Sequence, residues 1–141
     1  MFNNKIYFTC FYKYPLVRQL DKSDCGPAAL LSVLKYFGGE ASLWHIRNLC
    51  RTGLHGTTLY DMIEAAKSLG LSASGVKGSY GDLMNGKLPA IAHVHIDKRR
   101  EHFIVIYQIR EKYLIAVDPA RGRIKLKRDG SAWHTGQCLI G

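Results

Sequence analysis

The sequence predicts an α+β fold in which N-terminal helices pack on a C-terminal antiparallel sheet. Capped segments with helical periodicity precede residue 71, and short runs rich in β-branched and aromatic residues follow it. The connections between these runs are too short for helical crossovers, so neighbouring strands should be antiparallel. With 141 residues, 47% of them hydrophobic, and no internal repeat, residues 1–141 are expected to form a single domain.

The first predicted helix runs from about Cys25 to Phe37. Either Ser23 or Asp24 can cap its start, and Gly38-Gly39 suits its end. Apolar side chains recur along it at helical spacing and mark a buried stripe. The helix is therefore expected to lie against the core, with a cysteine at its N-terminus.

Two shorter helices are expected next. Ser42 opens one, and the Thr58-x-x-Asp61 pattern resembles a capping box for another that ends at Gly70. From Leu71 onward the apolar period changes to that of strands. The predicted strands are Ala90–Ile96, His102–Tyr107, Tyr113–Val117, Ile124–Lys127 and Gln137–Ile140.

The composition excludes several classes of protein. A disordered chain is excluded by the hydrophobic fraction, and no apolar run approaches the ~18 residues of a membrane span. The first residues make a poor signal peptide because aromatic residues alternate with lysines, so a cytoplasmic location is expected. The net charge of +9 favours an acidic partner. Nucleic-acid binding is not expected, because the basic residues are scattered.

The four cysteines are widely spaced and are expected to be reduced thiols: Cys10, Cys25, Cys50 and Cys138. Cys25 differs from the others because it stands at a predicted helix start. Unpaired backbone N–H groups and the positive end of the helix dipole favour a thiolate there. The following Gly26 is expected to let a substrate backbone approach closely. A lone cysteine is more often a core residue, so Cys25 needs a base before it can be assigned chemistry.

One predicted hairpin supplies a base and an orienting group. His102 begins a strand, and Asp118, followed by the rigid turn at Pro119, ends the next strand. The turn at 110–112 is about equidistant from both, so antiparallel pairing should place His102 and Asp118 side by side. A thiol, an imidazole and a carboxylate are together the groups of a Cys/His/Asp enzyme.

Four motifs follow one another in a recognisable order. They are Gln19–Leu30 with Tyr36–Gly38, His102–Ile106, Asp118–Gly122 and Trp133–Gly136. Together they resemble the bacteriocin-processing cysteine peptidases, the papain-like domains at the N-terminus of peptidase-containing ABC transporters. The resemblance extends from about Leu16 to Ile140.

The chain departs from the family pattern in two places. The connection between Leu126 and Trp133 is shorter and more polar than the helical one that the family has, which puts the local C-terminal structure in question. The chain also stops at Gly141 with no transporter behind it. The sequence leaves open whether this is an excised peptidase domain or a stand-alone relative.

The resemblance implies a role for each residue of the site. Cys25 would be the nucleophile, His102 the general base and then acid, and Asp118 the group that orients His102. Gln19 matches the family's glutamine whose side-chain amide helps to form the oxyanion hole, and the backbone N–H of Cys25 would be the second donor. This chemistry implies no metal and no cofactor.

The resemblance also implies a substrate and a partner. Family members cut leader peptides after a double glycine, which lacks side chains and can pass a narrow channel. The leader would be an amphipathic, often acidic helix that docks in a shallow apolar groove away from the thiol. The sequence assigns no residues to this groove, and Tyr36, Trp44 and Tyr60 are interpreted as core or rim. As part of an ABC transporter, or associated with one, the chain would lie at the cytoplasmic face of the membrane.

Three alternative functions are weighed against this one. A peptidase-like domain without activity would only bind a translocating substrate, but relatives of that kind lack the nucleophile. A metal-binding module could use His93 and His95, which are better interpreted as solvent-facing strand positions. Cys50 and His55 do not complete a pair of pairs with structural-zinc spacing. A transglutaminase-like acyl transfer would use the same triad, and the flanking motifs argue against it.

Overall fold

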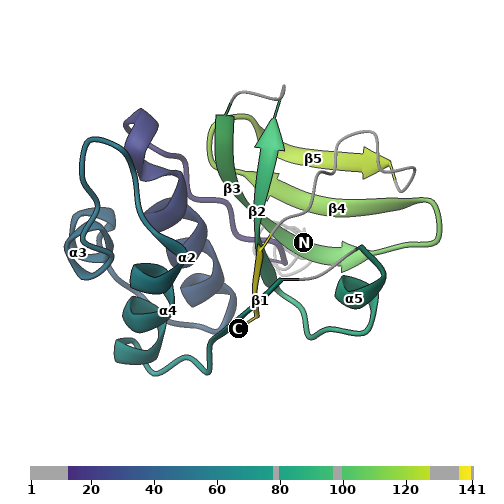
Figure 1. Ribbon diagram of the computed structural model, residues 1–141, viewed down its shortest axis with the longest axis horizontal. Helices are drawn as coiled ribbons and strands as arrows, with labels where there is room; N and C mark the ends of the chain where they lie inside the picture. The colour runs from purple at the N-terminus through teal and green to yellow at the C-terminus, as the bar shows by residue number, and fades with distance from the viewer. Residues whose placement is uncertain (1–12, 78–79, 97–99, 128–136, 141) are drawn as a thin grey trace, which may run out of the picture.

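The computed structural model describes residues 13–77, 80–96, 100–127 and 137–140. Figure 1 shows a group of helices standing beside a twisted sheet. The elements in chain order are the 3₁₀ turn η1 (Lys22–Asp24), α2 (Cys25–Tyr36), α3 (Leu43–Leu49), α4 (Leu59–Ser68), β1 (Ser74–Lys77), α5 (Tyr80–Met84), β2 (Ala90–Ile96), β3 (Arg100–Ile109), β4 (Tyr113–Asp118), β5 (Gly122–Lys127) and β6 (Gln137–Ile140). The strand order is β1-β6-β2-β3-β4-β5, and all pairings are antiparallel. The predicted α+β arrangement is confirmed.

The helix that carries Cys25 is the most buried helix described. Every residue of α2 from Gly26 to Leu34 is buried, and the helix packs on β3, α3 and α4. It ends before Gly38, whose φ of 84° lies in the left-handed region that glycine tolerates. The N-terminus of α2 is therefore held by a helix that is anchored in the core along most of its length.

The expected cap of α2 is wrong in detail. Asp24 occupies the N-cap position but makes no side-chain capping hydrogen bond, because η1 precedes it and its backbone is already helical, with φ −91° and ψ 0°. The side-chain cap lies one turn earlier, where Asp21 Oδ1 accepts the N–H of Ser23 at 3.1 Å. The carboxylate of Asp24 is thereby left for other contacts.

The other two predicted helix starts are confirmed. Ser42 Oγ accepts the backbone N–H of His45 at 3.1 Å, and Thr58 Oγ1 accepts that of Asp61 at 3.1 Å. The buried side chains of these helices are Ile46 in α3 and Met62, Ala65 and Ala66 in α4. Both helices begin at a hydroxyl cap and bury their apolar face against α2.

The sheet contains the five predicted strands and one that the sequence did not predict. The unpredicted strand, β1, has only four residues, all exposed, and therefore no alternation that would mark a strand. The short helix α5 was also not predicted. Both faces of the sheet are covered: Phe103 and Val105 join the core under the helices, whereas Ile104 and Ile106 join a second cluster with Leu83 of α5.

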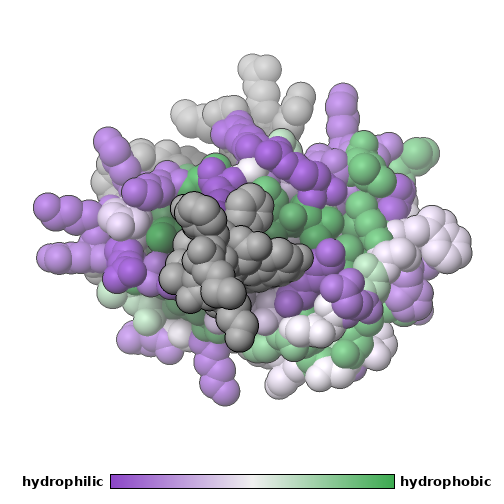
Figure 2. Space-filling view, turned by 180° about the vertical axis from the view of Figure 1, so that it is seen from behind, coloured by the Kyte–Doolittle hydropathy of each residue, from purple (hydrophilic) through white to green (hydrophobic). Residues whose placement is uncertain are grey.

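Several large hydrophobic side chains lie at the surface of the helical half. Tyr36, Trp44 and Tyr60 are 43%, 72% and 68% exposed, so of the two predicted alternatives, core or rim, these aromatics are not core residues. Figure 2 shows the molecule from behind, and on this side the hydrophobic side chains gather mainly over the half that contains the helices. No helix among the described residues is long and apolar enough to cross a membrane.

Candidate active site

Cys25 is the first residue of α2 and is partly exposed. The backbone N–H groups of the first helical turn have no partners within the helix, and the helix dipole is positive at this end. Cys50, the other described free thiol, is fully buried in the core, where burial raises its pKa to about 12 with a smaller contribution from Asp61. Of these two thiols, only Cys25 is placed to meet a substrate.

His102 and Asp118 are in contact, as the hairpin argument predicts. Nε2 of His102 lies 2.7 Å from Oδ1 of Asp118. The carboxylate side chain is 1% exposed, and the same oxygen accepts the backbone N–H of Ala120 at 2.7 Å and that of Arg121 at 3.3 Å. The turn after β4 therefore fixes the carboxylate, and the carboxylate fixes the ring. Because Nε2 faces Asp118, Nδ1 is the ring nitrogen that remains for Cys25.

The contact between these two side chains is diagonal and not directly across the strands. Val105 pairs with Val117, and the register of β3 and β4 shifts between this pair and the turn. Continuing that pairing by one residue puts Ile104 opposite Asp118, with His102 two residues farther along β3 on the same side. The register nearer the turn would put Val105 opposite Asp118, with His102 on the other side of β3. The bulge shifts the pairing by one residue and so brings His102 to the side of Asp118, where diagonal neighbours are within reach of long side chains.

The charges of the site hold His102 in its protonated form. Burial lowers the pKa of His102, but its interactions with the side chain of Asp118, and to a smaller extent with that of Cys25, outweigh burial and raise the pKa to about 9. Burial raises the pKa of Asp118, whereas the hydrogen bond from His102 and those from the Ala120 and Arg121 backbone lower it, and the lowering effects win. An imidazolium between a carboxylate and a sulfur is the resulting state.

Gln19 is tied to both halves of the site. Its backbone N–H donates to the carbonyl of Pro119 at 3.0 Å, next to the turn that holds Asp118. Its side-chain Nε2 donates to the carbonyl of Asp21 at 3.1 Å. Oε1 is buried and has no hydrogen-bond partner among the described residues. The amide is therefore oriented by one of its two N–H groups, and the second is available to another acceptor.

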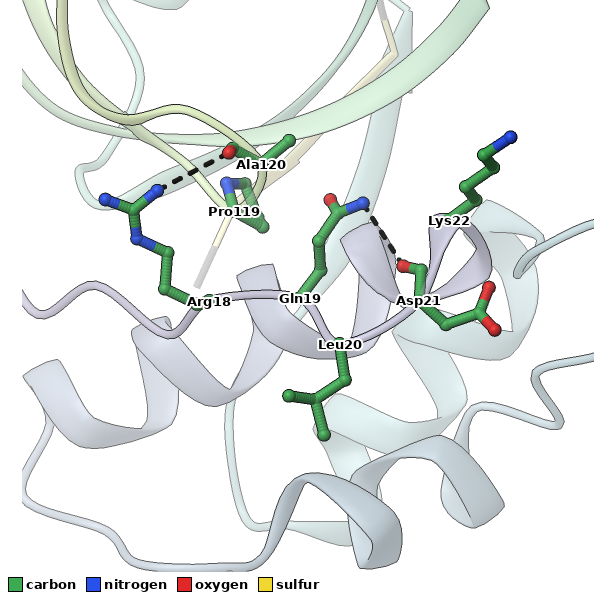
Figure 3. Close-up of a pocket in the computed structure, with 7 residues that line it drawn as sticks. All are labelled: Arg18, Gln19, Leu20, Asp21, Lys22, Pro119 and Ala120. Carbon is green, nitrogen blue, oxygen red and sulfur yellow. Dashed lines mark hydrogen bonds between the residues drawn. The ribbon is translucent and has the colours of Figure 1, made fainter.

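An open cleft of about 620 Å³ lies beside Gln19. The residues lining it are Arg18, Gln19, Leu20, Asp21, Lys22, Pro119 and Ala120. In Figure 3 the amide of Gln19 lies between Pro119 and Asp21, and Leu20 points away from it. Arg18 Nη1 donates to the carbonyl of Ala120 at 3.4 Å and joins the two walls of the cleft. The cleft offers room for a chain that passes the glutamine.

The expectation for Gly26 is corrected by its packing. A Cβ built at this position would meet Sδ of Met62 at 3.0 Å, Cβ of Thr57 at 3.3 Å and Cδ2 of Phe103 at 3.5 Å. The missing side chain therefore lets α2 pack tightly against α4 and β3, and is not directed toward an incoming substrate.

The predicted solvent-facing position of His93 is also wrong. Its ring stacks on Phe103 with centroids 4.4 Å apart, and Nε2 lies 3.6 Å from Glu101. Burial lowers the pKa of His93 more than the charge of Glu101 raises it. The alternation was interpreted with one solvated face, but both faces of the sheet are covered. Among the described residues, no group of three or more His, Cys, Asp and Glu could hold a metal ion.

One ion pair next to Cys25 is not predicted by the sequence pattern. Asp24 is fully buried, and its Oδ1 lies 3.1 Å from Nη1 of Arg47 on α3. The sequence predicts only a capping role for Asp24, and no spacing or periodicity connects it with an arginine on another helix. A buried aspartate next to a nucleophile does indicate that a cation is needed nearby, because buried charges require partners.

Comparison with known proteins decides the family. The sequence pattern of the Peptidase C39 family matches residues 13–135. The chain belongs to this family. The resemblance seen in the four motifs is thus confirmed, although the Trp133–Gly136 motif and the polar connection before it lie outside the described residues.

The relatives of this C39 peptidase domain include transporters and a short protein. It is 40% identical over 111 residues, 77% of this chain, to the pediocin PA-1 transport/processing ATP-binding protein PedD of Pediococcus acidilactici. The chain spans 15% of the length of that relative. An uncharacterized protein of Methanothermobacter marburgensis is 35% identical over 89% of this chain and 86% of its own length. The family therefore includes long transport proteins that contain this domain as a small part, and proteins of about the length of this chain.

Solved structures of peptidase domains share this fold. The peptidase domain of Streptococcus ComA, a bifunctional ABC transporter, matches with a TM-score of 0.80 and 34% identity over 90% of this chain and 98% of that domain. A double glycine motif protease from an AMS/PCAT transporter, solved with its leader peptide, matches with a TM-score of 0.82 and 30% identity over 92% of this chain and 91% of that one. The fold is that of the papain-like C39 peptidase domains.

Proposed function

We propose that this chain is a cysteine endopeptidase that removes leader peptides from bacteriocin-type precursors by cutting after Gly-Gly. The observation that carries the proposal is the His102 ring, which interacts with Cys25 while its Nε2 lies 2.7 Å from a buried carboxylate of Asp118. A protonated imidazole beside a sulfur is the arrangement that a thiol peptidase needs.

The reaction proceeds through a thioester. Sγ of Cys25 attacks the carbonyl carbon of the second glycine, and the carbonyl oxygen takes up the negative charge. The protonated His102 gives its proton to the leaving nitrogen as the C–N bond breaks, which releases the mature peptide and leaves the leader on sulfur. His102 then takes a proton from water, the hydroxide attacks the thioester, and the leader leaves as a carboxylic acid. Asp118 holds the ring in orientation throughout.

The oxyanion is stabilised by two N–H donors. The N–H of Gln19 Nε2 that does not donate to Asp21 is one, and the backbone N–H of Cys25 at the start of α2 is the other. Such a fixed donor contributes about 3 kcal/mol to the transition state in comparable sites. The Asp21 carbonyl matters here because it fixes the amide plane before the substrate arrives.

Gly-Gly specificity is inferred from the family and from steric reasoning. A double glycine motif protease with 30% identity covers nearly the whole of this fold. Two residues without side chains pass a narrow channel that larger ones would block. Replacing the first glycine of the pair in the substrate with leucine should abolish cleavage, and cleavage of the leucine substrate at the normal rate would refute the steric argument.

The partner is a precursor with an amphipathic, acidic leader, at the cytoplasmic face of the membrane. The chain carries a net charge of +9, which favours an acidic helix. The exposed aromatics of the helical half are suited to the apolar face of such a helix. A fused or associated ABC transporter is proposed because PedD is a transport/processing protein.

A domain that only binds the leader, without cutting it, is the second candidate. The two are separated by incubating the chain with a leader–core peptide and reading the products by mass spectrometry, with and without iodoacetamide. The peptidase yields one cut after Gly-Gly, and alkylation of Cys25 suppresses it. Binding without any cut would favour the silent domain.

Two variants make this experiment specific. Cys25→Ala should abolish cleavage while leader binding persists, because the groove and the thiol are separate. Cys50→Ala is the matched control: it removes a buried thiol from the core, and its product should keep cutting. Normal turnover by the Cys25→Ala protein would end the proposal.

A further inference from the structure

We infer that Arg47 is a positioning residue that holds the Gln19 amide in its oxyanion-stabilising orientation, acting through Asp24 and the backbone of Asp21. This inference rests on the proposed function, because it gives Arg47 a task in the proposed cleavage reaction. Arg47 lies on α3, a separate helix from the one that carries the nucleophile.

The starting point is a buried carboxylate directly before the nucleophile in the chain. The Asp24 side chain is 0% exposed, and its Oδ1 lies 3.1 Å from Nη1 of Arg47. That oxygen accepts no hydrogen bond from the described part of the chain, so the charge of the guanidinium is what compensates it. An uncompensated buried carboxylate is strongly unfavourable. The ion pair with Arg47 therefore fixes the position of the Asp24 side chain.

The second oxygen of Asp24 continues the network toward the site. Oδ2 accepts the backbone N–H of Asp21 at 3.0 Å, and the Asp21 carbonyl accepts the backbone N–H of Asp24 at 3.1 Å. These two hydrogen bonds close the turn. The same Asp21 carbonyl accepts an N–H of Gln19 Nε2 at 3.1 Å. Fixing the carboxylate of Asp24 thereby fixes the carbonyl that orients the amide of Gln19.

The burial of Asp24 separates this ion pair from an ordinary surface pair. The Arg47 side chain is 35% exposed, and a pair between two exposed side chains contributes little. Here one partner has no access to water, so removing the cation forces the carboxylate to move or to take up a proton. Either change disturbs the turn. The field of Arg47 also reaches Asp21, whose pKa is lowered mainly by the Ser23 N–H and in part by the Arg47 charge.

The test is Arg47→Met, with Arg47→Lys as the conservative variant. Arg47→Met should lower kcat on the leader–core peptide about 10-fold, with KM changed less than about twofold, because only transition-state stabilisation is lost. The rate at which iodoacetamide alkylates Cys25 should not change, since alkylation forms no oxyanion. Arg47→Lys should recover most of kcat. Arg51→Met is the matched control: Arg51 is exposed, and it forms no ion pair within the described residues.

A double-mutant comparison of kcat distinguishes this positioning role of Arg47 from a purely structural one. Arg47→Met should slow the Gln19→Ala protein no further, because both changes remove the same donor. Asp24→Asn, which removes the buried charge and keeps the side-chain shape, should make Arg47→Met nearly silent. This pair of variants keeps the test decisive if Arg47→Met alone unfolds the chain.

Two outcomes would overturn the inference. One is that kcat, KM and the alkylation rate all change together in Arg47→Met. The other is that its effect multiplies fully with that of Gln19→Ala. Failure of the proposed function itself looks different: the wild-type chain would then leave the leader–core peptide uncut, and no variant comparison would arise.

Discussion

The two sides of the candidate site are constructed differently. On the helix side, residues 19–25, the side-chain hydrogen bonds of Gln19, Asp21 and Asp24 join residues at most three positions apart. On the sheet side, His102 and Asp118 are 16 positions apart and meet only because two strands pair in one register. Gln19 and the η1 turn are thus held mainly by local hydrogen bonds, whereas the contact of His102 with Asp118 depends on long-range strand pairing.

The electrostatics of the two sides also differ. On the sheet side, the pKa of His102 is raised to about 9. The helix side carries the buried carboxylate of Asp24, which is compensated by the guanidinium of Arg47. Changes on the sheet side should therefore alter the pH dependence of catalysis, and changes on the helix side should alter its rate at every pH.

The two sides are joined at one backbone contact. The N–H of Gln19 donates to the Pro119 carbonyl at 3.0 Å, one residue after Asp118. Gln19 and the turn that holds Asp118 are therefore connected through the backbone.

The largest expected effect is on the sheet side. His102→Ala should lower kcat/KM by about 10³-fold or more, because it removes both the acid and the base of the reaction. Steady-state cleavage of the leader–core peptide measures it. His95→Ala, a histidine of the neighbouring strand, is the control and should retain activity. Equal losses in the two proteins would show that strand disruption and not chemistry explains the effect.

Asp118→Asn should lower kcat by about 10²-fold with less change in KM. The variant keeps an oxygen for the Ala120 N–H but loses the charge that helps to raise the pKa of His102. The ring should then titrate at lower pH. The alkaline limit of activity, which the pKa of His102 predicts near pH 9 for the wild type, should move down with it. Rate–pH profiles of the two proteins check this. An unchanged profile would remove Asp118 from its proposed role.

On the helix side, Gln19→Ala should lower kcat by up to about 10²-fold without moving the alkaline limit. The amide carries no titrating charge, so only transition-state stabilisation is lost. The same rate–pH experiment measures it. A shifted alkaline limit in this variant would mean that the two sides are electrostatically coupled through Gln19.

The last expected effect is on stability and not on catalysis. The pKa of His102 is raised from 6.5 to about 9 on folding, so its contribution is fully present below pH 6.5 and is lost as pH rises through 9. The wild type should lose up to about 3 kcal/mol of unfolding free energy relative to His102→Gln over this range. Urea unfolding at several pH values up to 9 measures it. If the unfolding free energies of the two proteins changed equally with pH, the raised pKa of His102 would be contradicted.

The local side was the more predictable one. The apolar spacing and the glycines at its end predict the helix that Cys25 begins. The family resemblance adds Gln19 to the site. The Asp24–Arg47 contact could not be predicted, because 23 positions separate the two and nothing in the pattern selects one arginine among several.

The long-range side was predictable only in outline. Counting residues to the turn predicts that His102 and Asp118 lie close together, but it does not predict the bulge that brings both side chains to the same side of the strand pair. It also assumed one solvated sheet face and so misplaced His93. Bulges and the cover on a sheet face depend on tertiary packing, which alternation alone does not record.

The most direct test of the central claim is to trap the acyl-enzyme. The chain is mixed with a leader–core peptide, quenched in acid after a few turnovers and digested for mass spectrometry. The account predicts a thioester of the leader, ending in Gly-Gly, on the peptide that carries Cys25, and its loss in Cys25→Ala. Cleavage that proceeds in Cys25→Ala with no adduct on the wild type would contradict it.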